Sequence, residues 1–329
     1  MLSFERLRTL HAVASFGSVH AAAKALHITN SAVSQQIAKL ESELGQSLLE
    51  RNGRGVRVTD AAAALVAHTQ RMIALMESAE ADFDAQRNSI FGRIRVAAFP
   101  TAARGLAPQA LRSLGDTCPQ LTVVLNEQEP PVSVPSLVRG DVDLVIVQDW
   151  ANAPLPPLEG LSKAPVLDDI ADIALPANHP LAGRDTINLE DLRSERWISG
   201  GHTASSVSET HVPSKWCDQW LEYTLRSRGH EPVVAHTAGE YATQIALVAA
   251  GLGICVIPRL GRDRLPRGVR IVAVRPSLRR QVYALWRTTN TRRRAISVTV
   301  EAFRTSASLI ANPELPVATT RDRKRLRRS

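Results

Sequence analysis

The sequence predicts a multidomain α+β protein with a small helical head, a long connecting helix and a larger α/β region of two lobes. Three observations favour this fold class. Residues 1–58 contain three short amphipathic helical patterns followed by a hairpin pattern. Residues 59–87 lack Gly and Pro and carry a heptad repeat of apolar residues. Residues 92–307 alternate strand and helix patterns, which is typical of parallel sheets covered by helices.

The composition is that of a globular protein with an excess of positive charge. The 329 residues are 44% hydrophobic and 22% charged, with a net charge of +8. This length allows two or three domains that each bury a core. Residues 313–329 contribute a net +4 and residues 1–58 a net +3, so the middle of the chain is nearly neutral. A basic head favours a polyanionic partner.

No leader pattern opens the chain, and its longest apolar run, Ile245–Ile257, is too short to span a bilayer. Cys118, Cys217 and Cys255 form no CxxC pattern and no Cys/His cluster. This spacing favours reduced, buried thiols over a redox pair or a metal site. We therefore expect a cytoplasmic protein with no cofactor, no metal and no membrane partner.

Residues 18–44 are typical of two helices joined by a tight turn. Ser18 is a suitable N-cap for the first helix, whose small Ala residues allow a close and steep helix crossing. The turn contains His27, a residue type that tolerates the left-handed region, and Thr29 or Asn30 can cap the second helix. In the second helix an apolar stripe is expected to face the core: Val33, Ile37, Leu40 and Leu44.

The opposite face of this second helix is polar, short-chained and almost uncharged. A solvated face usually carries Glu and Lys, so these hydroxyls and amides favour a surface that enters a DNA groove and hydrogen-bonds base edges and phosphates. The alternative is an ordinary amphipathic helix with a bland outer face. The residues expected at DNA in the two helices and their caps are Ser18, Thr29, Asn30, Ser31, Ser34, Gln35 and Lys39.

A basic hairpin pattern follows, with an apolar strand, an Asn-Gly turn and a return strand. Arg51, Arg54 and Arg57 lie along it with no acid between them. A charge run is usually a solvated face, but directly after a helix-turn-helix it favours a wing, with Arg51 and Arg54 at the DNA backbone or minor groove. The head is therefore predicted to be a winged helix-turn-helix that binds double-stranded DNA.

This stretch resembles the N-terminal domain of the LysR-type transcriptional regulators. The matching residues are Ala22, Ala23, Leu26, Ser31, Ala32, Ser34, Gln36, Ile37, Leu40, Glu41, Leu44, Gly45, Leu48, Arg51, Arg54, Thr59 and Ala61. Asn30, Gln35, Leu49 and Ala62 stand where that family more often has Gln, Arg, Phe and Gly. Because Asn30 and Gln35 lie on the expected reading face, these departures bear on which DNA sequence is preferred.

Residues 59–87 are predicted to form one helix about 44 Å long. Its apolar seam consists of Ala61, Leu65, His68, Met72, Leu75, Ala79 and Phe83. A helix so long and one-sided is expected to pair with a copy of itself, which would place two reading helices on successive major grooves of a two-fold-related operator. The family resemblance implies the same homodimer and a further pairing into a homotetramer.

The rest of the chain is predicted to form lobe I, at about 92–164 and 269–307, and lobe II, at about 165–268. The expected strands are 94–99, 121–126, 144–147, 170–175, 197–198, 233–236, 254–257, 269–274 and 281–287; the expected helices are 103–114, 134–139, 215–228, 240–250 and 292–306. The phrases LPANHPLAG (175–183) and LVAAGLGICVIPR (247–259) resemble the periplasmic-binding-protein-like effector domain of the same family. Residues 308–329 are expected to be a disordered basic tail.

Two such lobes bind a small molecule in the cleft between them, at the carboxyl ends of strands. The residues expected there are Pro100, Thr101, Ala102, Gln128, Gln148, Ser199, Gly200, His202 and Thr203. Each could equally be a turn or capping residue, and Thr101 and the 199–203 loop are the preferred contacts because open amides can hold an anion. Glu127 and Asp149 would oppose a simple anion, so a neutral or amino-bearing effector stays open.

No enzyme motif is present. The Gly251-Leu252-Gly253 run lacks a third glycine and follows a helix, the wrong order for a dinucleotide loop. Walker A, HExxH, GxSxG and zinc-ligand spacings do not occur. A secreted solute-binding protein would need an export signal and no DNA-binding head. The sequence thus predicts a sequence-specific DNA-binding regulator of the LysR type, controlled by a small-molecule effector; the alternative is a DNA-binding dimer whose effector domain is vestigial and ligand-free.

Overall fold

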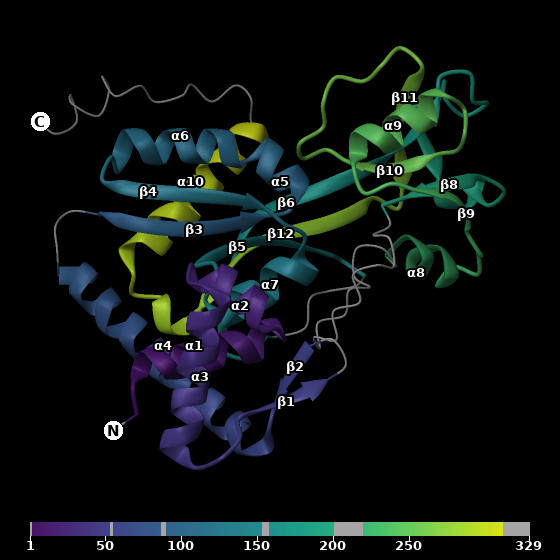
Figure 1. The fold of residues 1–329 in the computed structure, drawn as a ribbon. Helices are drawn as coiled ribbons and strands as arrows, with labels where there is room; N and C mark the ends of the chain where they lie inside the picture. The colour runs from purple at the N-terminus through teal and green to yellow at the C-terminus, as the bar shows by residue number, and fades with distance from the viewer. Residues whose placement is uncertain (1, 53–54, 87–89, 153–157, 201–219, 312–329) are drawn as a thin grey trace, which may run out of the picture.

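Figure 1 shows the protein as a computed structural model, which describes residues 2–52, 55–86, 90–152, 158–200 and 220–311. The head lies below one end of a large twisted sheet, and the long helix α4 connects the two. Some residues singled out from the sequence lie outside the described ranges: Arg54, His202, Thr203, Cys217 and tail residues 312–329.

The head consists of three helices and a hairpin, in the predicted order. Its elements are α1 (Phe4–Phe16), α2 (Val19–Leu26), α3 (Asn30–Leu44), β1 (Leu49–Asn52) and β2 (Gly55–Val58). The Ser18 hydroxyl caps α2 by accepting a hydrogen bond of 3.1 Å from the Ala21 N–H, and Thr29 caps α3 by accepting one of 3.2 Å from Ala32. Both cap predictions are confirmed, with Thr29 and not Asn30 at the start of α3.

The turn between α2 and α3 depends on His27. This residue has φ 56° and ψ 39°, and it is the only non-glycine residue with positive φ in the described part of the chain. Its N–H reaches back to the carbonyls of Ala23 and Lys24, which satisfies the end of α2. The predicted left-handed position is confirmed.

The head core is built from α1, α2 and the inner face of α3. Val33, Ile37 and Leu40 are buried there, as the apolar stripe predicts. The fourth predicted member, Leu44, is instead 38% exposed. It is the last residue of α3, where the helix ends at Gly45 in the left-handed conformation, with φ 65°.

The long helix α4 spans Asp60–Gln86, close to its predicted length. At its start Ala62 is fully buried against the head, and Leu65 packs against the same core. Further along, three apolar side chains of α4 are largely exposed: Met72 is 36% exposed, Leu75 72% and Met76 50%.

The α/β region is organised by one eight-stranded sheet with the order β4-β3-β5-β12-β6-β11-β7, and β10 pairs with β6 outside this path. In its first half, β3 (Gly92–Ala98) pairs in parallel with β4 (Leu121–Glu127) and β5 (Leu144–Trp150), as expected. The next two strands, β12 (Leu278–Arg287) and β6 (Leu161–Pro176), differ from the expected parallel arrangement. Each runs antiparallel to its neighbours, because β6 carries the chain out to the second lobe and β12 brings it back.

The second half of the sheet is built on the far end of β6. There it pairs with β10 (Cys255–Pro258) and with β11 (Val269–Arg275), and β11 also pairs with β7 (Thr186–Asn188). Residues 269–274 were expected to rejoin lobe I. That expectation is wrong, because they form β11 in the second lobe, and only β12 and the final helix return to lobe I. A separate pair, β8 (Arg196–Ser199) and β9 (Val233–Thr237), completes this half.

Helices cover both halves. They are α5 (Pro100–Gly105), α6 (Ala107–Thr117), α7 (Pro130–Arg139), α8 (Trp220–Arg226), α9 (Tyr241–Ala249) and α10 (Arg294–Ala311), with short 3₁₀ turns at Leu189–Leu192 and Thr288–Asn290. The single helix expected over 103–114 is two helices that break at Leu106, because Pro108 lacks the N–H that would continue the ladder. No described helix has both the length and the apolar character needed to cross a membrane.

The head also packs on the end of α7. The Arg139 guanidinium lies 5.0 Å from the centre of the Phe16 ring, and Arg139 is held by Asp141 at 2.9 Å. His11 on α1 is buried beside this pair, and burial lowers its pKa. The head and the α/β region are thus in direct contact as well as joined through α4.

Candidate functional site

The outer face of α3 is the candidate reading surface. Ser31, Ser34, Gln35 and Lys39 are all exposed there. The neighbouring Gln36 is different, because its amide donates to Glu5 at 3.3 Å and its oxygen accepts from Thr9, which ties α3 to α1. Gln36 is therefore part of the scaffold, and the exposed polar side chains around it are available to a partner.

The first turn of α3 is partly engaged within the head. The Asn30 amide lies 3.4 Å from the His20 ring nitrogen, and the Thr29 and Ser31 hydroxyls are 3.1 Å apart. Ser18 and Thr29 each accept a capping bond, and the Thr29 hydroxyl also bonds that of Ser31, so Ser18 keeps the freer hydroxyl proton for an outside acceptor. The helix N-terminus nearby also favours a phosphate.

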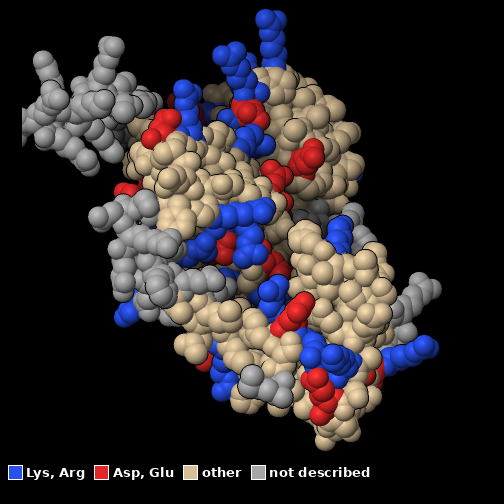
Figure 2. All heavy atoms as spheres, turned by 60° about the vertical axis from the view of Figure 1, so that its left-hand side comes forward, with Lys and Arg blue, Asp and Glu red and all other residues tan. Residues whose placement is uncertain are grey.

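The hairpin is less basic than its arginine spacing indicates. Glu50 and Arg57 are directly opposite each other in the β1–β2 register, and the Arg57 guanidinium donates to Glu50 at 2.8 Å and 2.5 Å. Arg57 is therefore neutralised within the hairpin. Arg51 is exposed and has no ion pair among the described residues. On the face drawn in Figure 2, basic and acidic side chains are likewise interspersed.

A narrow cleft lies between the two halves of the sheet, where five of the predicted effector residues come together. Its volume is about 80 Å³, and it receives Pro100, Thr101, Gln148, Ser199 and Gly200. Two others do not line it. Ala102 is fully buried in the lobe I core, and Gln128 lies outside the cleft with its side-chain oxygen buried and unbonded among the described residues.

The floor of the cleft is a buried arginine that sequence reasoning missed. Arg280, on β12, is 1% exposed and pairs directly with Asp169 on β6, with N···O distances of 2.8 Å and 2.7 Å. Its remaining donors reach the Thr101 hydroxyl at 2.9 Å and the Gln148 side-chain oxygen. The rings of Phe99 and Trp150 lie within 6 Å of its charge, at 5.4 Å and 5.9 Å.

Asp169 has a second role in the same network. Its other oxygen accepts the backbone N–H of Leu260 at 3.1 Å and that of Ile170 at 2.9 Å. The pair therefore holds two predicted contacts, Thr101 and Gln148, in fixed positions. Both charges are compensated within the protein, so the cleft has no free guanidinium from Arg280. Besides hydroxyl, amide and backbone groups, its lining includes the carboxyl group of Glu129.

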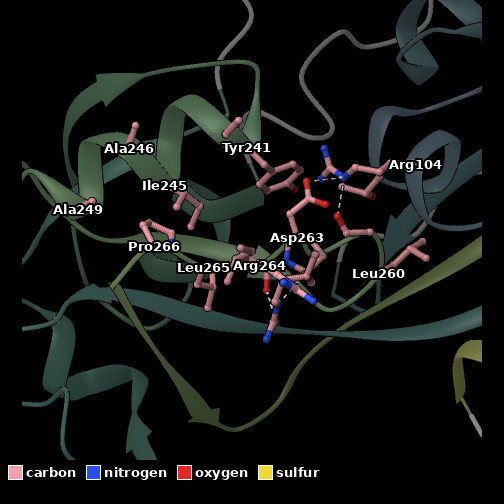
Figure 3. Close-up of a pocket in the computed structure, with 16 residues that line it drawn as sticks. Arg104, Tyr241, Ile245, Ala246, Ala249, Leu260, Asp263, Arg264, Leu265 and Pro266 are labelled. Carbon is pink, nitrogen blue, oxygen red and sulfur yellow. Dashed lines mark hydrogen bonds and ion pairs between the residues drawn. The ribbon is translucent and has the colours of Figure 1, made fainter. Parts of the chain in front are cut away.

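A larger hollow adjoins the cleft, between α5, α9 and the loop after β10 (Figure 3). Its volume is about 460 Å³, and Thr101 and Tyr241 line both spaces. Nothing in the sequence pattern indicated this hollow, because its walls come from segments far apart in the chain.

Redox and metal chemistry find no support in the described residues. Cys118 and Cys255 are buried, as expected, and burial raises the pKa of the Cys255 thiol to about 12. A thiol with so high a pKa is a poor nucleophile at neutral pH. The described residues contain no cluster of His, Cys, Asp or Glu that could hold a metal ion.

Two family models match the chain. One, described as LysR substrate binding domain, matches residues 87–308, and the other, described as bacterial regulatory helix-turn-helix protein, lysR family, matches residues 4–63. The chain is 28% identical over 262 residues to the HTH-type transcriptional regulator TtuA of Agrobacterium vitis, covering 78% of this chain and 81% of TtuA. It is 30% identical over 266 residues to the probable HTH-type transcriptional regulator LrrA of Synechococcus elongatus, covering 80% and 84%.

Solved structures show a similar fold over most of the chain. A full-length OxyR variant from Pseudomonas aeruginosa matches with a TM-score of 0.66 at 24% identity, covering 92% of this chain and 98% of that one. Full-length CbnR, a protein solved in complex with its target DNA, matches with a TM-score of 0.50 at 25% identity, covering 93% and 100%.

Removing one member of the Arg280–Asp169 pair is expected to destabilise the α/β region strongly. Asp169→Asn leaves the buried guanidinium without its counter-charge, which should reduce the free energy of unfolding by about 3 kcal/mol. The matched control is Asp168→Asn, the exposed neighbour on the same strand, which should change it by less than about 0.5 kcal/mol. Urea titration followed by tryptophan fluorescence measures both; equal midpoints for the two variants would contradict the role given to the pair.

Proposed function

The chain belongs to the LysR-type family of transcriptional regulators, and we propose that it works in the cytoplasm as a homodimer on a two-fold-related DNA operator, under the control of a small effector bound between its lobes. The observation that carries the DNA-binding part is the outer face of α3: exposed, short-chained and polar, on a helix whose inner face is fixed by Val33, Ile37 and Leu40. That the CbnR structure contains its target DNA supports the same partner class here.

We propose that side chains of α3 contact the base edges of the DNA and that the residues around α3 contact the DNA backbone. Ser34 and Gln35 lie one and two residues beyond the buried Val33, so they point out of the head in the N-terminal half of the helix. A glutamine amide can bond an adenine with both of its polar atoms. Ser18, Thr29, Asn30 and Ser31 sit near helix N-termini, where phosphates are favoured, with Lys39 at the far end of the face. Arg51 on β1, and by the sequence pattern Arg54, would contact the backbone from the hairpin.

Two substitutions separate these roles. Gln35→Ala should relax the preference at one base position by about 1–3 kcal/mol and leave the salt dependence unchanged. Arg51→Ala should weaken binding to all duplexes alike and lower the slope of log K against log salt by about one. Arg57→Ala, in which the lost charge was already paired with Glu50, is the matched control and should change the slope less. Fluorescence anisotropy on selected genomic fragments at several salt concentrations measures all three, and equal slopes for Arg51→Ala and Arg57→Ala would contradict the wing assignment.

We propose that α4 forms the dimer. Its seam residues Met72 and Leu75 are exposed, and an open apolar hollow of about 710 Å³ runs beside them, lined also by Leu2, Leu7 and Leu65. Exposed apolar side chains on one side of a long helix are expected to be buried by a second copy. The family resemblance supports a further pairing of dimers into a homotetramer.

A charge in the seam tests this assignment. Leu75→Glu should shift the protein towards monomer, raising the dimer dissociation constant by about tenfold or more, because it places a carboxylate in an apolar contact. Ala67→Glu adds the same charge to an exposed position of α4 outside the seam, and should leave the dimer intact. Sedimentation velocity over a concentration series distinguishes them, and a dimer that tolerates both substitutions equally would exclude α4 as the interface.

We propose that the effector is a small polar molecule held by Thr101, Gln148, Ser199 and Gly200. The remaining expected contacts, at 201–203, lie outside the described residues. The described cleft, at about 80 Å³, is far below the roughly 300–1,000 Å³ of metabolite sites. A ligand would therefore bind a more open arrangement of the lobes and shift the population towards it. The small volume of the cleft also favours the alternative, which is a regulator whose effector domain binds no ligand.

A metabolite screen by thermal shift decides between these two. A true effector present at a hundredfold excess over its Kd should stabilise the protein by about 2.7 kcal/mol. Thr101→Val, which removes one hydroxyl of the cleft, should weaken that effector several-fold, whereas Thr122→Val, an exposed position on β4, should not. If no metabolite raises the melting temperature, the effector domain is vestigial and the effector proposal is wrong.

A further inference from the structure

We propose that the hollow between α5, α9 and the loop 259–268 is a second small-molecule site, which takes a compact apolar body carrying one carboxylate. This site is separate from the cleft proposed for the effector and does not require that the cleft bind anything. Its volume, about 460 Å³, lies within the range of small-molecule sites, unlike that of the cleft.

The walls of the hollow are mainly apolar. One side of α9 supplies Ile245, Ala246 and Ala249, and the loop supplies Leu265 and Pro266 (Figure 3). The small side chains of Ala246 and Ala249 on α9 leave the space open, and Leu265 and Pro266 form the facing wall. An aryl or short branched group could cover this surface and remove it from water.

The hollow is preformed because polar bonds fix its loop. The Arg104 guanidinium donates to the Gly261 carbonyl at 2.6 Å, and Arg262 donates to the Ile257 carbonyl at 3.0 Å and to Asp172 at 2.7 Å. A Cβ at Gly261, where φ is +67°, would lie 2.5 Å from the Thr101 carbonyl oxygen. The loop therefore rests directly on α5 and cannot collapse onto α9 without breaking these bonds. Such preorganisation lowers the cost of binding.

The charges at the rim favour an anion. Three arginines and one acid line the hollow: Arg104, Arg262, Arg264 and Asp263. Arg262 is committed to the buried Asp172, whose pKa it lowers together with Arg259, and Arg104 lies 3.5 Å from Asp263. Arg264 is exposed and has no ion pair among the described residues. A single carboxylate on the ligand would pair with the Arg264 guanidinium and neutralise its charge.

The hollow touches both lobes. Thr101 and Arg104 come from α5 in lobe I, and α9 and the loop come from lobe II, with Thr101 and Tyr241 shared with the cleft. Leu260 from the same loop reaches into the lobe I core. A ligand in the hollow would therefore affect the relative arrangement of the two lobes. If it changes the affinity of the cleft for a ligand, the cleft ligand changes the affinity of the hollow by the same factor.

Three probes with one apolar body test the charge preference: phenylbutanoate, phenylbutanol and phenylbutylamine, titrated calorimetrically into the full-length protein. The carboxylate should bind about tenfold more tightly than the alcohol, and the amine most weakly. Arg264→Gln should remove most of that preference while keeping the alcohol's affinity, and Arg267→Gln, on the same loop but outside the hollow, should not. Equal affinities for the three probes would overturn the proposal.

Filling the space tests the location. Ala246→Trp should reduce phenylbutanoate affinity at least tenfold, whereas Thr243→Trp, an exposed position of α9 outside the hollow, should leave it unchanged. Ala249→Phe serves as a second filling variant if the first does not melt cooperatively. Ser199→Ala, which alters the cleft alone, should have no effect. Affinity that falls with Ser199→Ala but not with either filling variant would place the probe in the cleft and refute this site.

Discussion

The buried contact between Arg280 and Asp169 is the interaction on which the α/β region depends. The two residues are direct cross-strand partners on β12 and β6, the strands at which the two lobes meet. Through hydrogen bonds they reach α5 at Thr101, β5 at Gln148 and the loop after β10 at Leu260. Three further segments are thus tied to β12 and β6 by one ion pair with almost no exposure to solvent. Such a pair is retained only when every donor and acceptor is satisfied, because a buried charge left alone costs several kcal/mol, about 3–5.

This network also explains why the cleft and the hollow beside it differ in character. At the cleft, Asp169 neutralises the Arg280 guanidinium, and the polar lining consists of hydroxyls, amides and the Glu129 carboxyl group. At the hollow, the loop is fixed by Arg104 and Arg262 from its edges, which leaves its centre apolar. One arrangement of arginines therefore produces a polar space and an apolar space that share a wall at Thr101 and Tyr241.

Much of the head could be predicted from local sequence rules. The caps at Ser18 and Thr29, the turn at His27 and the length of α4 each depend on residues near one another in the chain, and each is confirmed. Periodicity could not reveal contacts between distant strands. Asp169 and Arg280, 111 residues apart, each fall one residue before an expected strand, so no pattern singles them out. The pairing of Glu50 with Arg57 also appears only once the hairpin register is known. The placement of β11 and the contact of Gly261 with Thr101 likewise depend on tertiary packing.

The strand β6 belongs to both lobes: its first part pairs with β12 and its last part with β10 and β11. A pleated strand bonded along both halves resists stretching and sharp folding but tolerates torsion about its own axis. If the lobes open, this geometry favours rotation of one lobe about the axis of β6 over a hinge-like separation. Since the head rests on the end of α7 in lobe I through Arg139 and Phe16, such a rotation would change the angle of lobe II relative to the DNA-binding helices.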